Sequence, residues 1–372
     1  MIERMEGRAL DSFDWQFLAV VGGILGVGVL SIYSVTQMQP GAGFPLYVRQ
    51  LIWIAVGAGA FFGMLVFDYH KIARLSYILY AITLLLLIVV LVAGKTSRGA
   101  QRWIPLGPFA FQPSEFAKLV LILVLATYYA HAPREGWLQR VVFPGLLMMP
   151  GLLLILRQPD LGSGLSFLAI YAAMLLVVGM RSKAMGILLL FALMAFPFAW
   201  EMMWGSLHDY QRERIMTFMD PGYDTGGKGY HGLQSRIAIG SGELLGKGLH
   251  GGTQSKLKFL PEGHTDFVFA VFAEEWGFVG GILLLGLFAV LIMLSLEIAL
   301  KAKDVLGALL AAGVIAMIGF CVVVNLGMTA GLLPIVGIPL PLMSYGGSAV
   351  VTTMAALGLL LNVKRRRLTL FY

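Results

Sequence analysis

The chain has 372 residues, of which 58% are hydrophobic and only 13% are charged. A soluble domain carries about 25% charged residues, so this composition excludes an ordinary soluble protein and predicts an integral membrane protein. The formal net charge of +7 does not predict nucleic-acid binding, because most of the basic residues flank apolar segments, where they act as topology signals.

Ten apolar segments are each long enough to cross a bilayer, which takes about 20 residues. They span residues 15–35, 46–67, 75–93, 114–130, 141–156, 164–180, 184–204, 266–299, 306–328 and 343–363. The predicted fold is therefore an all-α polytopic membrane protein with ten transmembrane helices. The sequence predicts one transmembrane domain over residues 1–372, with a large extracytoplasmic loop at about residues 205–265, between helices seven and eight.

The Lys and Arg residues of the short loops predict the orientation, because short cytoplasmic loops carry an excess of basic residues. One side collects Arg4, Arg8, Lys71, Arg74, Arg134, Arg140, Arg181, Lys183, Lys301, Lys303, Lys364, Arg365, Arg366 and Arg367. The short loops of the other side hold Arg49, Lys95, Arg98, Arg102 and Arg157. Both termini are therefore expected in the cytoplasm, and the connections of the second side are expected to face outward.

The first outward connection, residues 94–118, is rich in glycine and polar residues. Its Arg98, Arg102 and Lys118 are costly beside lipid unless they are paired or face an anion. Glu115 lies in the first turn of the following helix, three residues before Lys118. This spacing predicts either a local ion pair or a lysine that faces a cavity and binds a phosphate.

The next two outward connections also carry polar residues. In residues 156–164, Asp160 is expected either to cap the next helix or to hold a cation or a basic partner. Glycine is dense in the long loop and predicts no stable helix over residues 222–232 and 240–252. A polar loop of this length is typical of a functional segment, here one that binds an anionic or sugar-bearing ligand. The six histidines lack zinc-site spacing, so no metal ligand is predicted.

The stretch LPEGHTDFVFAVFAEEWG, residues 260–277, places carboxylates at and inside an apolar span. Asp266 is expected at the start of the helix, with Thr265 or His264 as the N-cap. The helix N-terminus favours the ionised carboxylate while partial burial opposes ionisation, which suits a general base; a capping role alone is the alternative. Glu274 lies about 12 Å deeper along the helix than Asp266 and could line the same outward cavity as Asp266, whereas Glu275 is expected to pair with another span.

The last outward turn, residues 325–349, is nearly uncharged and contains three prolines. Pro and Gly at membrane depth expose backbone, which is tolerated only beside protein or a wet cavity. The turn is therefore predicted to be a re-entrant wall, with helix packing through Gly346 and Gly347 as the alternative.

Several of these blocks together resemble the SEDS family (shape, elongation, division and sporulation). The blocks are NLGMTAGLLPIVGIPLPLMSYGGSA, RWIPLGPFAFQPSEFAK, RQPDLGSGL, GYHGLQSRIAIGSGELLGKG and FLPEGHTDFVFAVFAEEWG, in the family's order and over the whole chain. Within the family, the chain is most similar to the subgroup that determines rod shape.

The resemblance implies a peptidoglycan glycosyltransferase that polymerises lipid II, a disaccharide-pentapeptide on undecaprenyl diphosphate, at the outer face of the bacterial cytoplasmic membrane. It implies that Asp266 is the catalytic aspartate. The candidate substrate-binding residues are Lys118, Glu115, Arg102, Arg98, Asp160, His264 and Ser344. No cofactor is implied, although a divalent cation, Mg²⁺ or Mn²⁺, stays open. The implied partner is a class B penicillin-binding protein, a transpeptidase.

Three alternatives remain at this stage. A lipid II flippase would use the same cavity, but the short inner loops lack a comparable polar pocket. A scaffold that only recruits the transpeptidase would leave Asp266, Glu115 and Lys118 unexplained. A polymerase of the division machinery, rather than of elongation, would share the same chemistry.

Overall fold

The computed structural model describes residues 14–37, 44–97, 100–106, 109–131, 136–179, 216, 228–256, 259–260 and 263–367. Within these residues, nine helices are long and apolar enough to cross a membrane. They are α2 (Trp15–Gln37), α3 (Leu46–Val66), α5 (Ser76–Ala93), α6 (Pro113–His131), η1 with α7 (Leu138–Val142, Phe143–Arg157), α8 (Leu161–Val178), α13 (Val268–Leu300), α14 (Val305–Thr329) and α15 (Gly347–Arg367). The all-α polytopic fold is thus confirmed, and the predicted seventh span, 184–204, lies outside the described residues.

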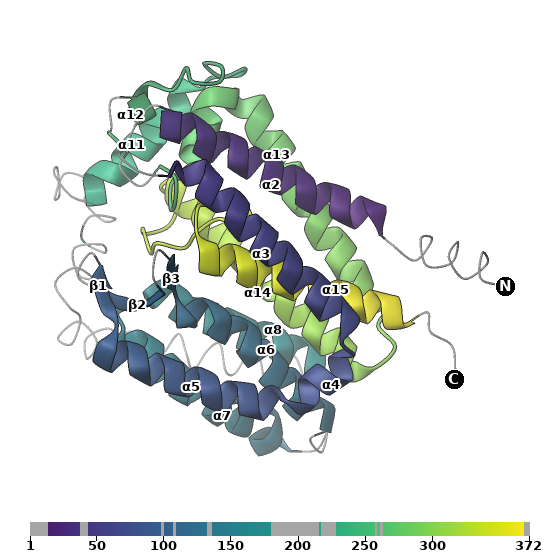
Figure 1. Cartoon of the computed structure of the whole chain (residues 1–372). Coiled ribbons are helices and arrows are strands. Elements are labelled where there is room, and N and C mark those ends of the chain that lie inside the picture. Colours follow the sequence, from purple (N-terminus) through teal and green to yellow (C-terminus); the bar gives the residue numbers. More distant parts are fainter. Residues whose placement is uncertain are drawn as a thin grey trace.

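The centre of the bundle is formed by α6, α14 and α15. Residues 119–126 of α6 are all buried, and the helix packs against α5, α8, α14 and α15. A helix that is apolar all round is buried on every side, which explains this central place. In Figure 1, α3 lies beside α15 and α2 lies beside α13, and these pairs are in contact. The outer helices expose many apolar side chains, as a surface that contacts lipid does.

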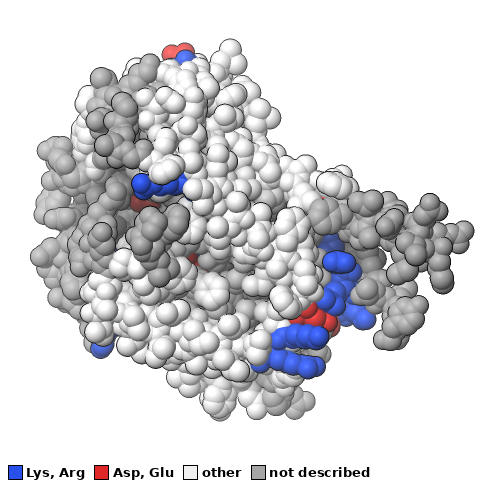
Figure 2. Space-filling model, in the orientation of Figure 1, with Lys and Arg blue, Asp and Glu red and all other residues white. Residues whose placement is uncertain are grey.

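The two ends of the bundle differ in chemistry. α2 begins and α15 ends at the same end, close to the short helix α4 (Tyr69–Arg74), whereas the strands and the helices α11 and α12 lie at the opposite end (Figure 1). Lys and Arg side chains gather over the α4 end, and the face between the ends is mainly white (Figure 2). This end carries Lys71 and Arg74 on α4 and Lys364, Arg365 and Arg366 on α15.

A small antiparallel sheet precedes α6 and was not predicted. It consists of β1 (Lys95–Ser97), β2 (Ala100–Leu106) and β3 (Phe109–Phe111) in the order β1-β2-β3. Ile104 pairs with Phe111, and the backbone N–H of Gln112 then donates to Ser348 Oγ at 2.9 Å. The sheet therefore connects the first outward segment to the start of α15.

The long loop contains a helix, α11 (Lys228–Ser241), followed by the single turn α12 (Thr253–Lys256). The prediction of no stable helix over 222–232 is therefore wrong for residues 228–232. Tertiary packing overrides the poor helix propensity of glycine here, because α11 packs against α13 and α14 and buries Ser235 and Ala238 completely.

The backbone of α13 breaks at Gly277, which has φ 64° and ψ −163°. Only glycine adopts such a conformation without strain. Residues 243–248 of the loop satisfy the backbone groups that the break frees: Lys247 N donates to Glu274 O at 3.1 Å and Phe278 N donates to Glu243 O at 2.8 Å. The first part of α13, which follows Asp266, is thus held by the loop as well as by the bundle.

Candidate active site

Asp266 lies in a turn, residues 263–267, directly before α13; we call it the acid turn. The helix begins at Val268, its N-cap is Phe267, and no side chain caps it. The predicted N-cap role of Thr265 or His264 is therefore wrong. Phe267 is buried, whereas Asp266, Thr265 and His264 are partly exposed, so the turn presents its polar residues at the outward-predicted end of the bundle.

Three consecutive carbonyl groups hold the acid turn in place. The carbonyl of His264 accepts from Tyr345 N at 2.8 Å, that of Thr265 from Ser344 Oγ at 2.7 Å, and that of Asp266 from Asn325 Nδ2 at 2.9 Å. We call these donors the clamp. Turns without such bonds are mobile, so the clamp fixes the backbone that carries the acid.

The segment between α14 and α15, residues 330–346, belongs to the turn that was predicted to be a re-entrant wall, and we call it the wall. The described residues contain no helix or strand there, yet Ile338, Leu340 and Met343 are each at most 2% exposed. Gly28 of α2 allows this depth, because a Cβ at that position would lie 2.7 Å from the Cα of Met343. The alternative prediction also holds in part, since Gly347 packs directly against the ring of Trp53.

Gln50 of α3 steadies the wall and was missed in the sequence. Its side chain is 1% exposed; its Nε2 donates to Ser344 O at 3.2 Å, and its Oε1 accepts from Gly346 N at 3.4 Å. A lone amide within an apolar span is costly and marks a specific partner, and this signal would have identified the residue.

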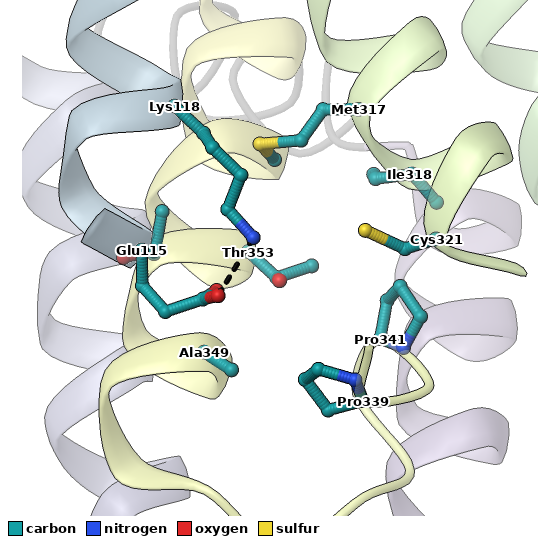
Figure 3. Close-up of a pocket in the computed structure, with 10 residues that line it drawn as sticks. Glu115, Lys118, Met317, Ile318, Cys321, Pro339, Pro341, Ala349 and Thr353 are labelled. Atoms are coloured by element: carbon teal, nitrogen blue, oxygen red, sulfur yellow. Dashed lines mark hydrogen bonds and ion pairs between the residues drawn. The ribbon is translucent and has the colours of Figure 1, made fainter. Parts of the chain in front are cut away.

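Beside the wall lies a small cavity of about 20 Å³, which is room for about one water molecule. It is lined by Glu115, Lys118, Met317, Ile318, Cys321, Pro339, Pro341, Ala349, Thr352 and Thr353 (Figure 3). We call it the Lys118 cavity. Lys118 Nζ lies 2.7 Å from Glu115 Oε1, and the two side chains are only 5% and 9% exposed. The predicted local ion pair of Lys118 is therefore confirmed, and Lys118 also faces a cavity; its binding of a phosphate stays a prediction.

Asp160 caps α8, as predicted, by accepting from Ser163 N at 3.3 Å. Its other oxygen, Oδ2, accepts from Ser114 Oγ at 3.0 Å and from Gln112 Nε2 at 3.2 Å, which joins α8 to the start of α6. Arg102 of β2 lies 3.7 Å from Asp160 Oδ1 and donates to the carbonyl oxygens of Gln158 and Pro159. Asp160 thus meets its basic partner within the chain. Arg98 lies outside the described residues.

Glu274 does not line the Lys118 cavity but anchors the long loop. Its Oε1 accepts from Lys247 Nζ at 2.7 Å and from Thr253 N at 2.7 Å, and the side chain is fully buried. Glu275 bonds to Ser34 Oγ of α2, which confirms the predicted pairing with another span. Both glutamates are therefore structural supports of the half-helix that follows the acid turn.

No group of three or more His, Cys, Asp or Glu side chains could hold a metal ion in the part of the chain that the structure describes. The carboxylate of Glu115 is engaged by Lys118 and that of Asp160 by serine, amide and guanidinium donors. This donor set does not fit a resident metal ion, which prefers several free oxygen ligands.

A bundle of helices long and apolar enough to cross a membrane, with a clamped acid and a buried ion pair at one end, defines a multi-pass membrane protein with a polar site at one end of the bundle. A family model for cell cycle proteins of the FtsW, RodA and SpoVE type matches residues 13–368, and the chain belongs to this family, the SEDS proteins.

Two relatives and one solved structure illustrate the likeness. The peptidoglycan glycosyltransferase MrdB of Escherichia coli (strain K12) is 43% identical over 78% of this chain and 77% of its own length. The peptidoglycan glycosyltransferase RodA of Treponema pallidum (strain Nichols) is 32% identical over 98% of this chain and 100% of its own. A chain of a peptidoglycan synthase complex, solved to explain how polymerization and crosslinking are coordinated, matches with a TM-score of 0.81 and 35% identity, covering 96% of this chain and 99% of that one.

Proposed function

We propose that this protein is a peptidoglycan glycosyltransferase that polymerises lipid II for cell elongation. The relatives named MrdB and RodA, aligned over most of their length, support the activity and the elongation role. The observation that carries the proposal is structural: the acid turn and the Lys118 cavity lie against the same wall segment, since Ser344 bonds to the turn and Pro339 and Pro341 line the cavity. The acid turn and the cation therefore both lie beside one wall segment, which supports a common site.

In the proposed reaction, Asp266 accepts the proton of the 4-hydroxyl of the acceptor's GlcNAc. The oxygen attacks the anomeric carbon of the donor, the glycosidic bond forms with inversion from α to β, and undecaprenyl diphosphate leaves. Its developing charge needs a cation, which Lys118 supplies. Arg102 and Arg98 are further candidates, as are His264 and Asp160 for binding. Ser344 contacts the acid turn, so we assign it a supporting role.

The proposed location is the bacterial cytoplasmic membrane, with both termini in the cytoplasm and the site outside. The basic residues at the end where α2 begins and α15 ends support this orientation, because positive charge marks the cytoplasmic side. The proposed partner is a class B penicillin-binding protein, and the likeness to a chain of a peptidoglycan synthase complex supports it.

The decisive experiment uses the purified protein and labelled lipid II, with polymer resolved on gels. Asp266→Asn and Asp266→Ala should fold yet lose about 10²–10⁴-fold in rate, the usual contribution of a general base. Asp68→Asn makes the same charge change beside α4, at the opposite end, and should retain activity. Near wild-type polymerisation by either Asp266 variant would refute the assignment.

Two further arms separate the remaining alternatives. Scrambling of fluorescent lipid II in liposomes without any polymer would favour a flippase. Polymerisation in EDTA, and after return of Mg²⁺ or Mn²⁺, decides whether a divalent cation accompanies the diphosphate.

A further inference from the structure

The acid turn is connected to the Lys118 cavity through one buried amide, that of Asn325. Its Nδ2 donates to Asp266 O at 2.9 Å and to Ile338 O at 2.8 Å. Ile338 directly precedes Pro339, which lines the cavity, and Cys321, one helical turn before Asn325 on α14, lines it as well. Asn325 therefore joins the acid turn to the segment that lines the Lys118 cavity.

We propose that Asn325 is a positioning residue for the transfer: its amide sets the place of Asp266 relative to the Lys118 cavity. The inference rests on the proposed function. Asn325 bonds to the main chain of Asp266 and so acts through that residue. The other two members of the clamp, Tyr345 and Ser344, hold the carbonyls of His264 and Thr265. Among the three, only Asn325 joins the main-chain carbonyl of Asp266 itself to the wall beside the cavity.

The Nδ2 of Asn325 makes two hydrogen bonds and its Oδ1 makes none among the described residues, and this difference supports a specific role. Asn325 is completely buried, and its Oδ1 has no hydrogen-bond partner among the described residues. Burying an acceptor without a partner is costly. An apolar residue at this position would avoid burying an unpartnered oxygen. The presence of asparagine is therefore best explained by the two carbonyls to which its Nδ2 donates, those of Asp266 and Ile338.

The chain offers a matched control in Asn362 of α15. It is also completely buried, and its Nδ2 also donates to two backbone carbonyls, those of Met64 and Phe67. These lie at the end of α3, far along the bundle from the acid turn (Figure 1). Replacing either asparagine by alanine removes two bonds donated to backbone carbonyls. Asn362→Ala also removes the bond that its Oδ1 accepts from Arg366 Nε at 3.0 Å, and only Asn325→Ala touches the acid turn.

The experiment measures kcat and KM for lipid II together with thermal unfolding. Asn325→Ala should lower kcat by about 10²-fold, as expected for an about 1 Å misplacement of a reacting group. KM should stay within about twofold, because an interaction that matters only in the transition state leaves ground-state binding unchanged. Asn362→Ala should lower the unfolding temperature comparably yet keep kcat. Asn325→Ser, which keeps one donor, should fall between Asn325→Ala and wild type.

A double-mutant test adds a readout that a purely structural role would not produce. In an Asp266→Asn background, Asn325→Ala should leave the residual rate unchanged, because a residue that acts through Asp266 has nothing left to position. Equal losses of kcat in Asn325→Ala and Asn362→Ala would overturn the proposal. So would failure of both Asn325 variants to fold while Asn362→Ala folds.

The proposed function and the positioning role of Asn325 are refuted by different results. If Asp266→Asn polymerises at the wild-type rate, the proposed function itself is wrong. If Asp266→Asn is inactive but Asn325→Ala keeps its kcat, only the positioning role is wrong.

Discussion

Replacing Glu115 by Gln is expected to destabilise the bundle strongly, because it leaves the charge of Lys118 buried without a counter-charge. The pair is 2.7 Å apart and its side chains are 9% and 5% exposed. Breaking a buried pair by removing one partner costs about 3–5 kcal/mol. The loss should therefore far exceed that of an ordinary surface substitution.

The double replacement Glu115→Met with Lys118→Met separates the structural role of the pair from its functional one. It removes both charges and fills the site with apolar side chains of similar volume, and such exchanges are often neutral or stabilising by about 1–4 kcal/mol. The double variant should regain most of the lost stability. It should still make no polymer, because the Lys118 cavity would no longer offer a cation to the leaving diphosphate.

Reversible unfolding in mixed micelles measures the stabilities, and labelled lipid II measures polymerisation. The control is Glu297→Gln, which breaks the exposed pair with Lys301, 2.6 Å apart with side chains 44% and 57% exposed, and should cost about 0.3–0.5 kcal/mol. Equal effects of Glu115→Gln and Glu297→Gln would refute the energetic argument. Near wild-type polymerisation by the double variant would refute the role of Lys118 in the reaction.

Two other outcomes follow from the backbone break and from the charges beside α4. Gly277→Ala should destabilise the protein by about 1–3 kcal/mol and abolish polymerisation, because the added Cβ would lie 2.3 Å from a backbone nitrogen. The control is Gly286→Ala in the same helix, where the added Cβ meets open space. It should change neither the stability nor the polymerisation rate. The second concerns the pKa of Asp68. Burial raises this pKa, but the hydrogen bonds from His70 and the charge of Arg366 lower it by more, so the pKa of Asp68 lies below its ordinary value. A carboxyl group with a lowered pKa stabilises the folded state above its unfolded pKa, and this contribution is lost as the pH falls below about 4. Unfolding between pH 3 and 6 should show this loss in the wild type and not in Asp68→Asn.

Features that depend on neighbouring residues could be predicted from the sequence. The span 266–299 agrees with α13 (Val268–Leu300), because the length of an apolar run is a local property. The ion pair of Glu115 with Lys118 and the capping of α8 by Asp160 follow from spacings of three residues or fewer. Such interactions are fixed by helix geometry alone.

Features that depend on distant segments could not be predicted in the same way. The clamp joins residues 264–266 to Asn325 and to residues 344–345, and no periodicity links these positions. The break at Gly277 is stabilised by residues 243–248, so an isolated glycine in an apolar span gives no sign of it. The helix α11 forms because it is packed between other helices, whereas its glycines alone favour a loop.

Among the described polar residues within the spans, the buried amides and the Glu115–Lys118 pair are held in different ways, and the difference bears on which of them act in chemistry. Asn325, Gln50 and Asn362 bond to backbone carbonyls, so the fold itself accounts for their place in an apolar bundle. Glu115 and Lys118 neutralise one another beside a cavity, which lowers the cost of burying either charge but holds no two segments of the chain together, since both lie on α6. In the proposed reaction, the diphosphate would share Lys118 with Glu115, because an ammonium group has three donors. The amides are therefore explained by the backbone they hold, whereas the pair is explained only if the proposed function supplies a ligand for it.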